Sequence, residues 1–194
     1  MSTRREIFGA LCRAAEPLYG EAEARSIAEM ILLSKCGISR SAFIVDPMAE
    51  ACVEGLDSIV EQISHWRPVQ YILGEASFDD MELEVSEGVL VPRPETEELV
   101  AWIAQDSAMG AHIVDVCTGS GAIAIALARR VRCSKVVGID LSPEALAIAR
   151  RNAARYAPEI EIVEDDALGE FSAGSIVQAD VVVSNPPYIP EADR

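Results

Sequence analysis

The second half of the chain alternates short runs of valine and isoleucine with segments of helical character, and this alternation constrains the fold more than any other feature. Apolar runs cover 112–117, 135–140, 160–164 and 180–184, and the segments 120–130 and 142–156 between them have helical patterns. Short runs that are apolar throughout are typical of strands buried on both faces of a parallel sheet. The order strand, helix, strand, helix, strand predicts an α/β fold with a Rossmann-like, doubly wound sheet.

A separate all-helical domain is predicted for the first 66 residues. Thr3 and Glu6 have the spacing of a capping box at the start of a helix. A second helix over 21–35 has Gly37 as its C-terminal cap, and Asp46-Pro47 predicts the start of a further helix that runs to about His65. A small bundle of this kind is expected to recognise the substrate.

A β-hairpin linker is predicted between the two domains, over residues 67–92. Extended segments are expected at 69–73, 77–78 and 81–85, because turn-forming residues separate short runs with strand character. Residues 93–194 then form the domain that holds the parallel sheet.

The charge and the composition exclude several classes of protein. Residues 71–194 contain 22 acidic and 9 basic side chains, a net charge of −13, whereas a protein that binds duplex nucleic acid needs a basic surface. No apolar run approaches the roughly 20 residues that cross a bilayer, and no signal peptide is recognisable, so a cytoplasmic protein without membrane association is expected. With no Cys-x-x-Cys pair among five cysteines and only two histidines, no metal site is expected.

A glycine-rich turn follows the first strand of the predicted sheet, at 115–121. Glycines allow a ligand to approach the backbone, and the next helix presents free N–H groups. Asp140 ends the second strand, 19 residues after Gly121, where a carboxylate can bind both hydroxyls of a ribose. These features predict a cofactor of the adenosine type. They do not separate S-adenosylmethionine from a nicotinamide cofactor, because 119–124 also fits the pattern G-x-G-x-x-A.

The Ser184–Tyr188 segment, Ser-Asn-Pro-Pro-Tyr, decides between these cofactors. It directly follows the fourth strand, at the edge where open α/β sheets bind ligands. An amide nitrogen is a poor nucleophile, and it needs two acceptors for its N–H groups while it lies in line with the methyl donor. The Asn185 side-chain oxygen and the Pro186 carbonyl supply these acceptors, the prolines make the loop rigid, and Tyr188 lies against the planar acceptor group. The segment predicts methylation of an amide-type nitrogen.

With these motifs the chain resembles the HemK/PrmC family, the N5-glutamine methyltransferases of peptide-chain release factors. The resemblance covers nearly the whole chain, and the Pro-Arg-Pro-Glu-Thr-Glu segment at 92–97 separates it from adenine-N6 methyltransferases, which share Asn-Pro-Pro-Tyr. It implies that S-adenosyl-L-methionine is the cofactor, and that the substrate is the Gly-Gly-Gln glutamine of class I release factors. The implied cofactor contacts are Cys117, Thr118, Gly119, Ser120, Gly121, Asp140, Asp166, Ala167 and Asn185. The implied substrate contacts are Asn185, Pro186, Pro187 and Tyr188, with Asn185, Pro186 and Tyr188 catalytic.

Three departures from the family pattern keep alternatives open. Cys117 stands where glycine is usual, and related enzymes that methylate a ribosomal protein often have cysteine there. Ala167 stands where an aromatic residue often covers the adenine. Family members also continue past Asn-Pro-Pro-Tyr, so the resemblance implies that 93–194 is an incomplete methyltransferase domain. The alternatives are a ribosomal-protein glutamine methyltransferase, an adenine-N6 methyltransferase of nucleic acids, and a non-catalytic cofactor-binding fragment.

Overall fold

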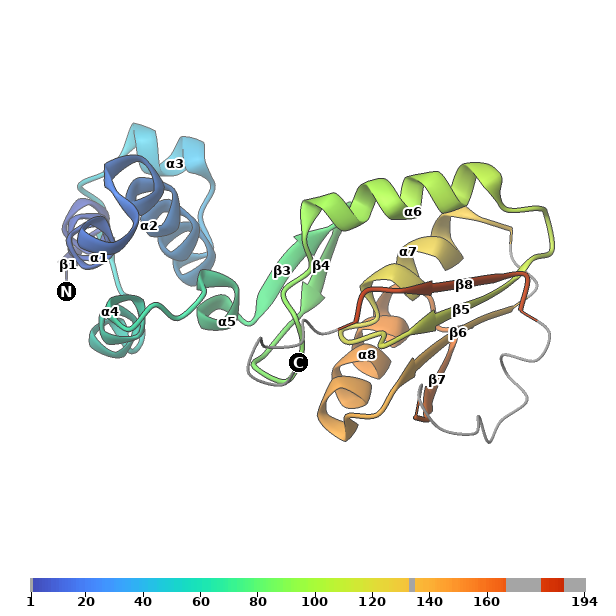
Figure 1. Ribbon diagram of the computed structural model, residues 1–194. Coiled ribbons are helices and arrows are strands. Elements are labelled where there is room, and N and C mark those ends of the chain that lie inside the picture. Colours follow the sequence, from blue (N-terminus) through green and yellow to red (C-terminus); the bar gives the residue numbers. More distant parts are fainter. Residues whose placement is uncertain (1, 133–134, 167–178, 187–194) are drawn as a thin grey trace. The chain divides into compact units, whose positions relative to one another are not determined.

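The computed structural model describes residues 2–132, 135–166 and 179–186 (Figure 1). The chain forms two compact units, Met1–Gly74 and Glu75–Arg194. Residues 67–74 therefore belong with the helical unit, and the hairpin belongs with the sheet. The described residues include no helix that is long and apolar enough to cross a membrane.

The first unit is a small helical bundle with one short pair of strands. Its elements are β1 (Ser2–Thr3), α1 (Arg4–Tyr19), α2 (Glu21–Cys36), α3 (Arg40–Val45), β2 (Glu50–Ala51), α4 (Leu56–Ser64) and α5 (Val69–Leu73). The core of the unit contains fully buried aliphatic side chains of α1 and α2, such as Leu11 and Ile31. The predicted capping box is confirmed, since the Glu6 amide donates to Thr3 Oγ1 and the Thr3 amide donates to Glu6 Oε2.

The helix predicted from Asp46-Pro47 to His65 is wrong in its first half. The chain instead forms β2, which pairs antiparallel with β1, and helix α4 begins only after Gly55. The amides of Arg4 and Arg5 donate to the carbonyls of Ala49 and Pro47. Residues 46–51 thus supply hydrogen-bond acceptors to the free amides at the N-terminus of α1. These tertiary contacts override the local helical signal of the segment.

The extended segment predicted at 69–73 is also wrong, because these residues form the short helix α5. Pro68 precedes the helix, and Gly74 ends it in the left-handed conformation with φ 81°. Ile72 is buried in the core of the first unit. A run rich in β-branched and aromatic residues is ambiguous at this length, and here packing against the bundle selects the helix.

In its described residues, the second unit contains a parallel sheet, a hairpin and three helices. Its elements are β3 (Glu75–Phe78), β4 (Met81–Glu84), α6 (Pro94–Asp106), β5 (His112–Val116), α7 (Ala122–Arg130), β6 (Lys135–Asp140), α8 (Pro143–Tyr156), β7 (Glu161–Glu164) and β8 (Val181–Ser184). The sheet order is β7-β6-β5-β8, and every neighbouring pair is parallel (Figure 1). The predicted α/β fold with a Rossmann-like parallel sheet is confirmed. A β-hairpin is present too, but it covers residues 75–84, a shorter stretch than the predicted 67–92.

One hydrophobic core joins the sheet to the helices and the hairpin. Its buried side chains include Phe78 and Leu83 of the hairpin, Val100 of α6, Leu127 of α7 and Ile113 of β5. The hairpin alternates buried and exposed residues, so one of its faces lies on this core. It is therefore a packed part of the second unit.

The turn of the hairpin is tied to two helices. Asp79 and Asp80 form the turn, both with positive φ, at 49° and 57°. The Asp79 carboxylate accepts hydrogen bonds from the guanidinium of Arg130, at 2.9 Å from Nε, and its amide donates to Glu97 Oε1 at 3.2 Å. An aspartate with positive φ is unusual, and the arginine explains why a residue with a carboxylate occupies this position.

Candidate functional site

The carboxyl ends of β5 and β8 lie side by side, and this brings two of the predicted motifs together. Val116, the last residue of β5, is paired with Ser184, the last residue of β8. The Ser184 hydroxyl also donates to the Val116 carbonyl at 2.7 Å. Cys117 and Asn185 therefore leave adjacent parallel strands at the same level, with Asn185 half-buried and Pro186 exposed.

The turn after β5 requires unusual backbone conformations. Cys117, Gly119 and Gly121 all have positive φ, at 59°, 56° and 81°. Cys117 was expected to end the strand, but it is the first residue of the turn. A Cβ added at Gly119 would meet no atom within 4 Å, so the backbone there faces open space. This is the geometry that lets a ligand approach the main chain.

Asp140 binds this turn directly. Its Oδ2 accepts from the Gly119 amide at 2.8 Å, and its Oδ1 accepts from the Ser142 amide at 3.0 Å. Each carboxylate oxygen can accept a second hydrogen bond, so the group still has capacity for ribose hydroxyls. The structure thus places Asp140 in direct contact with the glycine turn.

Asp115 lies beneath the turn with no exposure to solvent. Its Oδ2 accepts from the Thr118 hydroxyl at 2.6 Å and from the Ala124 amide at 3.2 Å. Its Oδ1 has no hydrogen-bond partner among the described residues. Burial raises the pKa of Asp115 to about 7, against the two hydrogen bonds, which lower it, and the charge of Asp140 raises it further.

The remaining predicted site residues divide into two groups. Thr118 and Ser120 are buried in the turn, and Asp166 follows β7, the strand beside β6. The Asp165 amide, next to Asp166, donates to the Asp140 carbonyl at 3.2 Å. Ala167, Pro187 and Tyr188 lie outside the described residues.

The described residues fit a nucleoside cofactor with a charged tail. A carboxylate stands at the end of the second strand of the βαβ unit, an open backbone lies at Gly119, and α7 begins at Ala122 with its first N–H groups at the same edge of the sheet. Asn185 and Pro186, which both carry oxygen acceptors, follow β8 at the same edge. The arrangement can hold a ligand over the turn while a second polar group lies against Asn185.

Two residues that shape the site were missed by the sequence reasoning. A Cβ at Gly138 on β6 would lie 2.9 Å from Thr118 Oγ1, so glycine there lets the turn approach the sheet. Asn152 is buried on the apolar face of α8 and donates to the Ser120 carbonyl at 2.9 Å. A polar residue at a core position of a predicted helix can be recognised in the sequence as a sign of a buried hydrogen-bonding role. A glycine inside an apolar strand is a weaker signal of close approach.

Replacing Cys117 by glycine is expected to stabilise the second unit relative to a Cys117→Ala variant. Both substitutions remove the thiol, but only glycine adopts φ 59° without strain. We expect a difference of about 1 kcal/mol in the free energy of unfolding, measured by urea titration. Equal stability of the two variants would contradict the idea that Cys117 strains the turn.

The comparisons with known proteins show which proteins the two parts of the chain are similar to. Residues 10–74 match the family model described as the PrmC N-terminal domain, and residues 113–194 match a methyltransferase domain. The chain is 40% identical to the release factor glutamine methyltransferase of Mycolicibacterium smegmatis, over 89% of this chain and 62% of that protein. It is 37% identical to that of Bacillus subtilis, over 97% of this chain and 68% of that protein. It is 41% identical to that of Chlorobaculum tepidum, over 88% of this chain and 63% of that protein. The chain therefore spans about two thirds of the length of these relatives.

Proposed function

The chain belongs to the family of release factor glutamine methyltransferases, and from this membership we propose that it methylates the side-chain nitrogen of a protein glutamine with S-adenosylmethionine as the methyl donor. One observation of the structure supports the proposal most strongly. Paired strands bring Asn185 to the same edge as the glycine turn and Asp140. We also propose that the enzyme acts in the cytoplasm.

The bound cofactor would supply an electrophilic methyl group on a positively charged sulfur. The turn at 117–121 and Asp140 would hold the cofactor, and Asp140 would accept hydrogen bonds from its ribose hydroxyls. Asn185 Oδ1 and the Pro186 carbonyl would accept hydrogen bonds from the two N–H groups of the substrate amide, which would orient its nitrogen for methyl transfer. These acceptors would also stabilise the positive charge that develops on nitrogen as the N–CH3 bond forms and the S–CH3 bond breaks. The methylated amide then loses one N–H proton to solvent and is neutral again. The proposed role of Asn185 is therefore both positioning and electrostatic.

We propose the Gly-Gly-Gln glutamine of class I release factors as the acceptor. The names of the curated relatives support a release factor as the substrate. The charge of the chain supports a protein rather than a nucleic acid, since residues 71–194 have a net charge of −13. A surface of this charge repels phosphate backbones and attracts basic protein segments.

The test is transfer of labelled methyl groups from S-adenosylmethionine. We expect label in a class I release factor and none in the same factor after its Gly-Gly-Gln glutamine is replaced by alanine. Duplex DNA, RNA and ribosomal proteins are offered in parallel. Label in a nucleic acid would contradict the proposal, and label in a ribosomal protein alone would move the substrate to the alternative glutamine acceptor. Binding of S-adenosylhomocysteine with no transfer to any acceptor would support a non-catalytic fragment.

A further inference from the structure

Asn152 is a buried polar side chain that the proposed reaction does not use. It lies on α8 between the buried residues Ala149 and Ala153 and is 2% exposed. A buried amide weakens a helix–sheet interface unless its hydrogen bonds are made. Its contacts therefore show which parts of the fold it joins.

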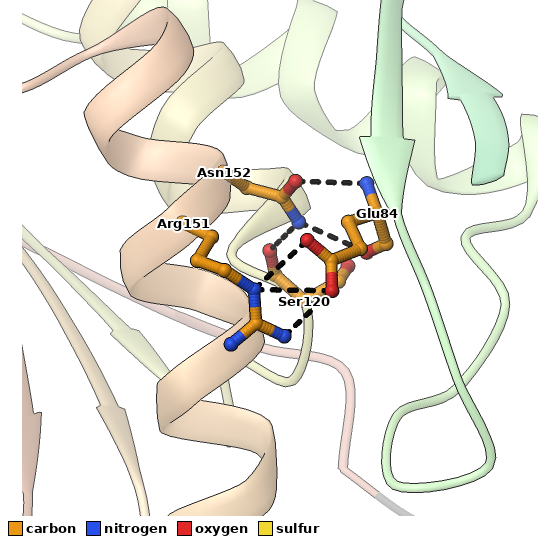
Figure 2. A network of polar contacts seen from close by, with 4 residues as sticks. All are labelled: Glu84, Ser120, Arg151 and Asn152. Carbon is orange, nitrogen blue, oxygen red and sulfur yellow. Dashed lines mark hydrogen bonds and ion pairs between the residues drawn. The ribbon is translucent and has the colours of Figure 1, made fainter. Parts of the chain in front are cut away.

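Three hydrogen bonds connect Asn152 to two separate segments (Figure 2). Its Oδ1 accepts from the Glu84 amide at 2.8 Å, and its Nδ2 donates to the Glu84 carbonyl at 3.0 Å. The same Nδ2 donates to the Ser120 carbonyl at 2.9 Å. Only one orientation of the amide satisfies one donor and two acceptors, so the surrounding main chain dictates how the side chain is turned.

The two segments are the hairpin and the glycine turn. Glu84 is the last residue of β4, and Ser120 lies between Gly119 and Gly121. A turn with two glycines of positive φ has little conformational preference of its own. Its carbonyl at Ser120 is held by Asn152 on one side, and its amide at Gly119 is held by Asp140 on the other.

We propose that Asn152 is a positioning residue for the cofactor, which holds the glycine turn in its binding conformation against the docked hairpin. This inference rests on the proposed function, because it takes the turn as the cofactor site. Asn152 does not itself lie in the turn. It acts through its hydrogen bond to the Ser120 carbonyl. Because Asn152 also binds Glu84, the conformation of the turn depends on the docked hairpin.

Arg151 provides a matched control on the same helix. Its guanidinium binds the Glu84 carboxylate through Nε at 2.9 Å and 3.0 Å and through a third contact at 2.6 Å (Figure 2). This ion pair also attaches the hairpin to α8, and the guanidinium holds the pKa of Glu84 below its usual range. No described contact joins Arg151 to the glycine turn. Loss of Arg151 therefore weakens the docking of the hairpin and leaves the Ser120 bond in place.

The experiment compares Asn152→Asp with Arg151→Gln in the 194-residue chain. Aspartate keeps the acceptor for the Glu84 amide and loses both donated hydrogen bonds, at nearly constant volume. Affinity for S-adenosylhomocysteine is measured by calorimetry at a temperature where every variant is folded, because a purely structural loss changes affinity only through the folded fraction. We expect the dissociation constant to rise about tenfold for Asn152→Asp and to stay within about twofold for Arg151→Gln.

Hydrogen exchange without any cofactor gives a second readout. We expect the amides of 119–121 to exchange faster in Asn152→Asp than in the wild type. In Arg151→Gln the same amides should exchange at the wild-type rate. Coupling between two sites is reciprocal, so S-adenosylhomocysteine should also slow exchange of the Glu84 amide in the wild type. Asn152→Ser removes the whole amide without adding a charge, so it controls for the new carboxylate of Asn152→Asp. We expect the two variants to agree in affinity and in exchange.

The outcomes separate this inference from the proposed function. A wild type that binds S-adenosylhomocysteine, with variants of Asn152 that bind it equally well and exchange normally at 119–121, overturns the inference alone. A wild type that does not bind S-adenosylhomocysteine overturns the proposed function, and the inference with it. Equal losses of affinity in the variants of Asn152 and Arg151 would show that hairpin docking in general, rather than the Ser120 bond, controls the turn.

Discussion

Replacing Asn185 by alanine is expected to lower kcat for methyl transfer by about 10²–10³-fold. The substitution removes one of two proposed acceptors for the substrate amide, and with it the stabilisation of charge on the nitrogen. The glycine turn and its bond to Asp140 do not depend on the Asn185 side chain. The dissociation constant of S-adenosylhomocysteine should therefore change far less, by about threefold or under.

Ser184→Ala is the matched control for this experiment. Ser184 precedes Asn185 and donates to the Val116 carbonyl at 2.7 Å, so its loss perturbs the end of β8 without removing an acceptor. We expect kcat to fall only a few-fold in this variant. If Asn185→Ala loses no more activity than Ser184→Ala, the acceptor role of Asn185 is wrong, whatever the substrate.

The second large effect is expected at Asp115, in the dependence of stability on pH. The pKa of this buried carboxyl is raised to about 7 in the folded chain, from an ordinary value of 3.8. The folded state then binds the proton more tightly than the unfolded state, so the stability contributed by this group is greatest at acidic pH and falls as the pH rises toward 7. Asp115→Asn, which cannot ionise, is free of this loss.

The comparison is made by urea titration of the wild type and Asp115→Asn from pH 4.5 to pH 8. We expect the free energy of unfolding of the variant to rise by roughly 3 kcal/mol relative to that of the wild type between pH 4.5 and pH 8, because each pKa unit corresponds to about 1.4 kcal/mol. Any fixed cost of the new amide is the same at every pH and does not affect the slope. Glu159→Gln, at an exposed position, measures the slope that a lost surface carboxylate produces. Parallel curves for Asp115→Asn and the wild type would refute the raised pKa.

Sequence reasoning succeeded where a structure depends on local residues. The capping box at Thr3 and the C-terminal cap at Gly37 were both predicted, and each uses atoms within a few residues. The parallel sheet was predicted because buried strands have a distinctive composition. The meeting of Asn185 with the glycine turn then followed from topology alone, since parallel strands end at one edge.

It failed where distant residues override the local pattern. Residues 46–51 have a helical start signal, yet their carbonyls accept from the amides of α1. Residues 69–73 have strand composition, yet Ile72 packs into the bundle as part of α5. The contacts of Asn152 could not be predicted either, because its partners lie 32 and 68 residues away along the chain.

The attachment of the hairpin also bears on the order in which the chain can fold during synthesis. The contacts that fix the hairpin reach 51 residues ahead from Asp79 to Arg130 and 74 residues ahead from Glu82 to Tyr156. A two-stranded hairpin alone is at best marginally stable in water. The core of the bundle, in contrast, is complete by Leu73. A ribosome therefore releases a bundle that can fold at once, followed by a hairpin that must wait for two helices still being translated.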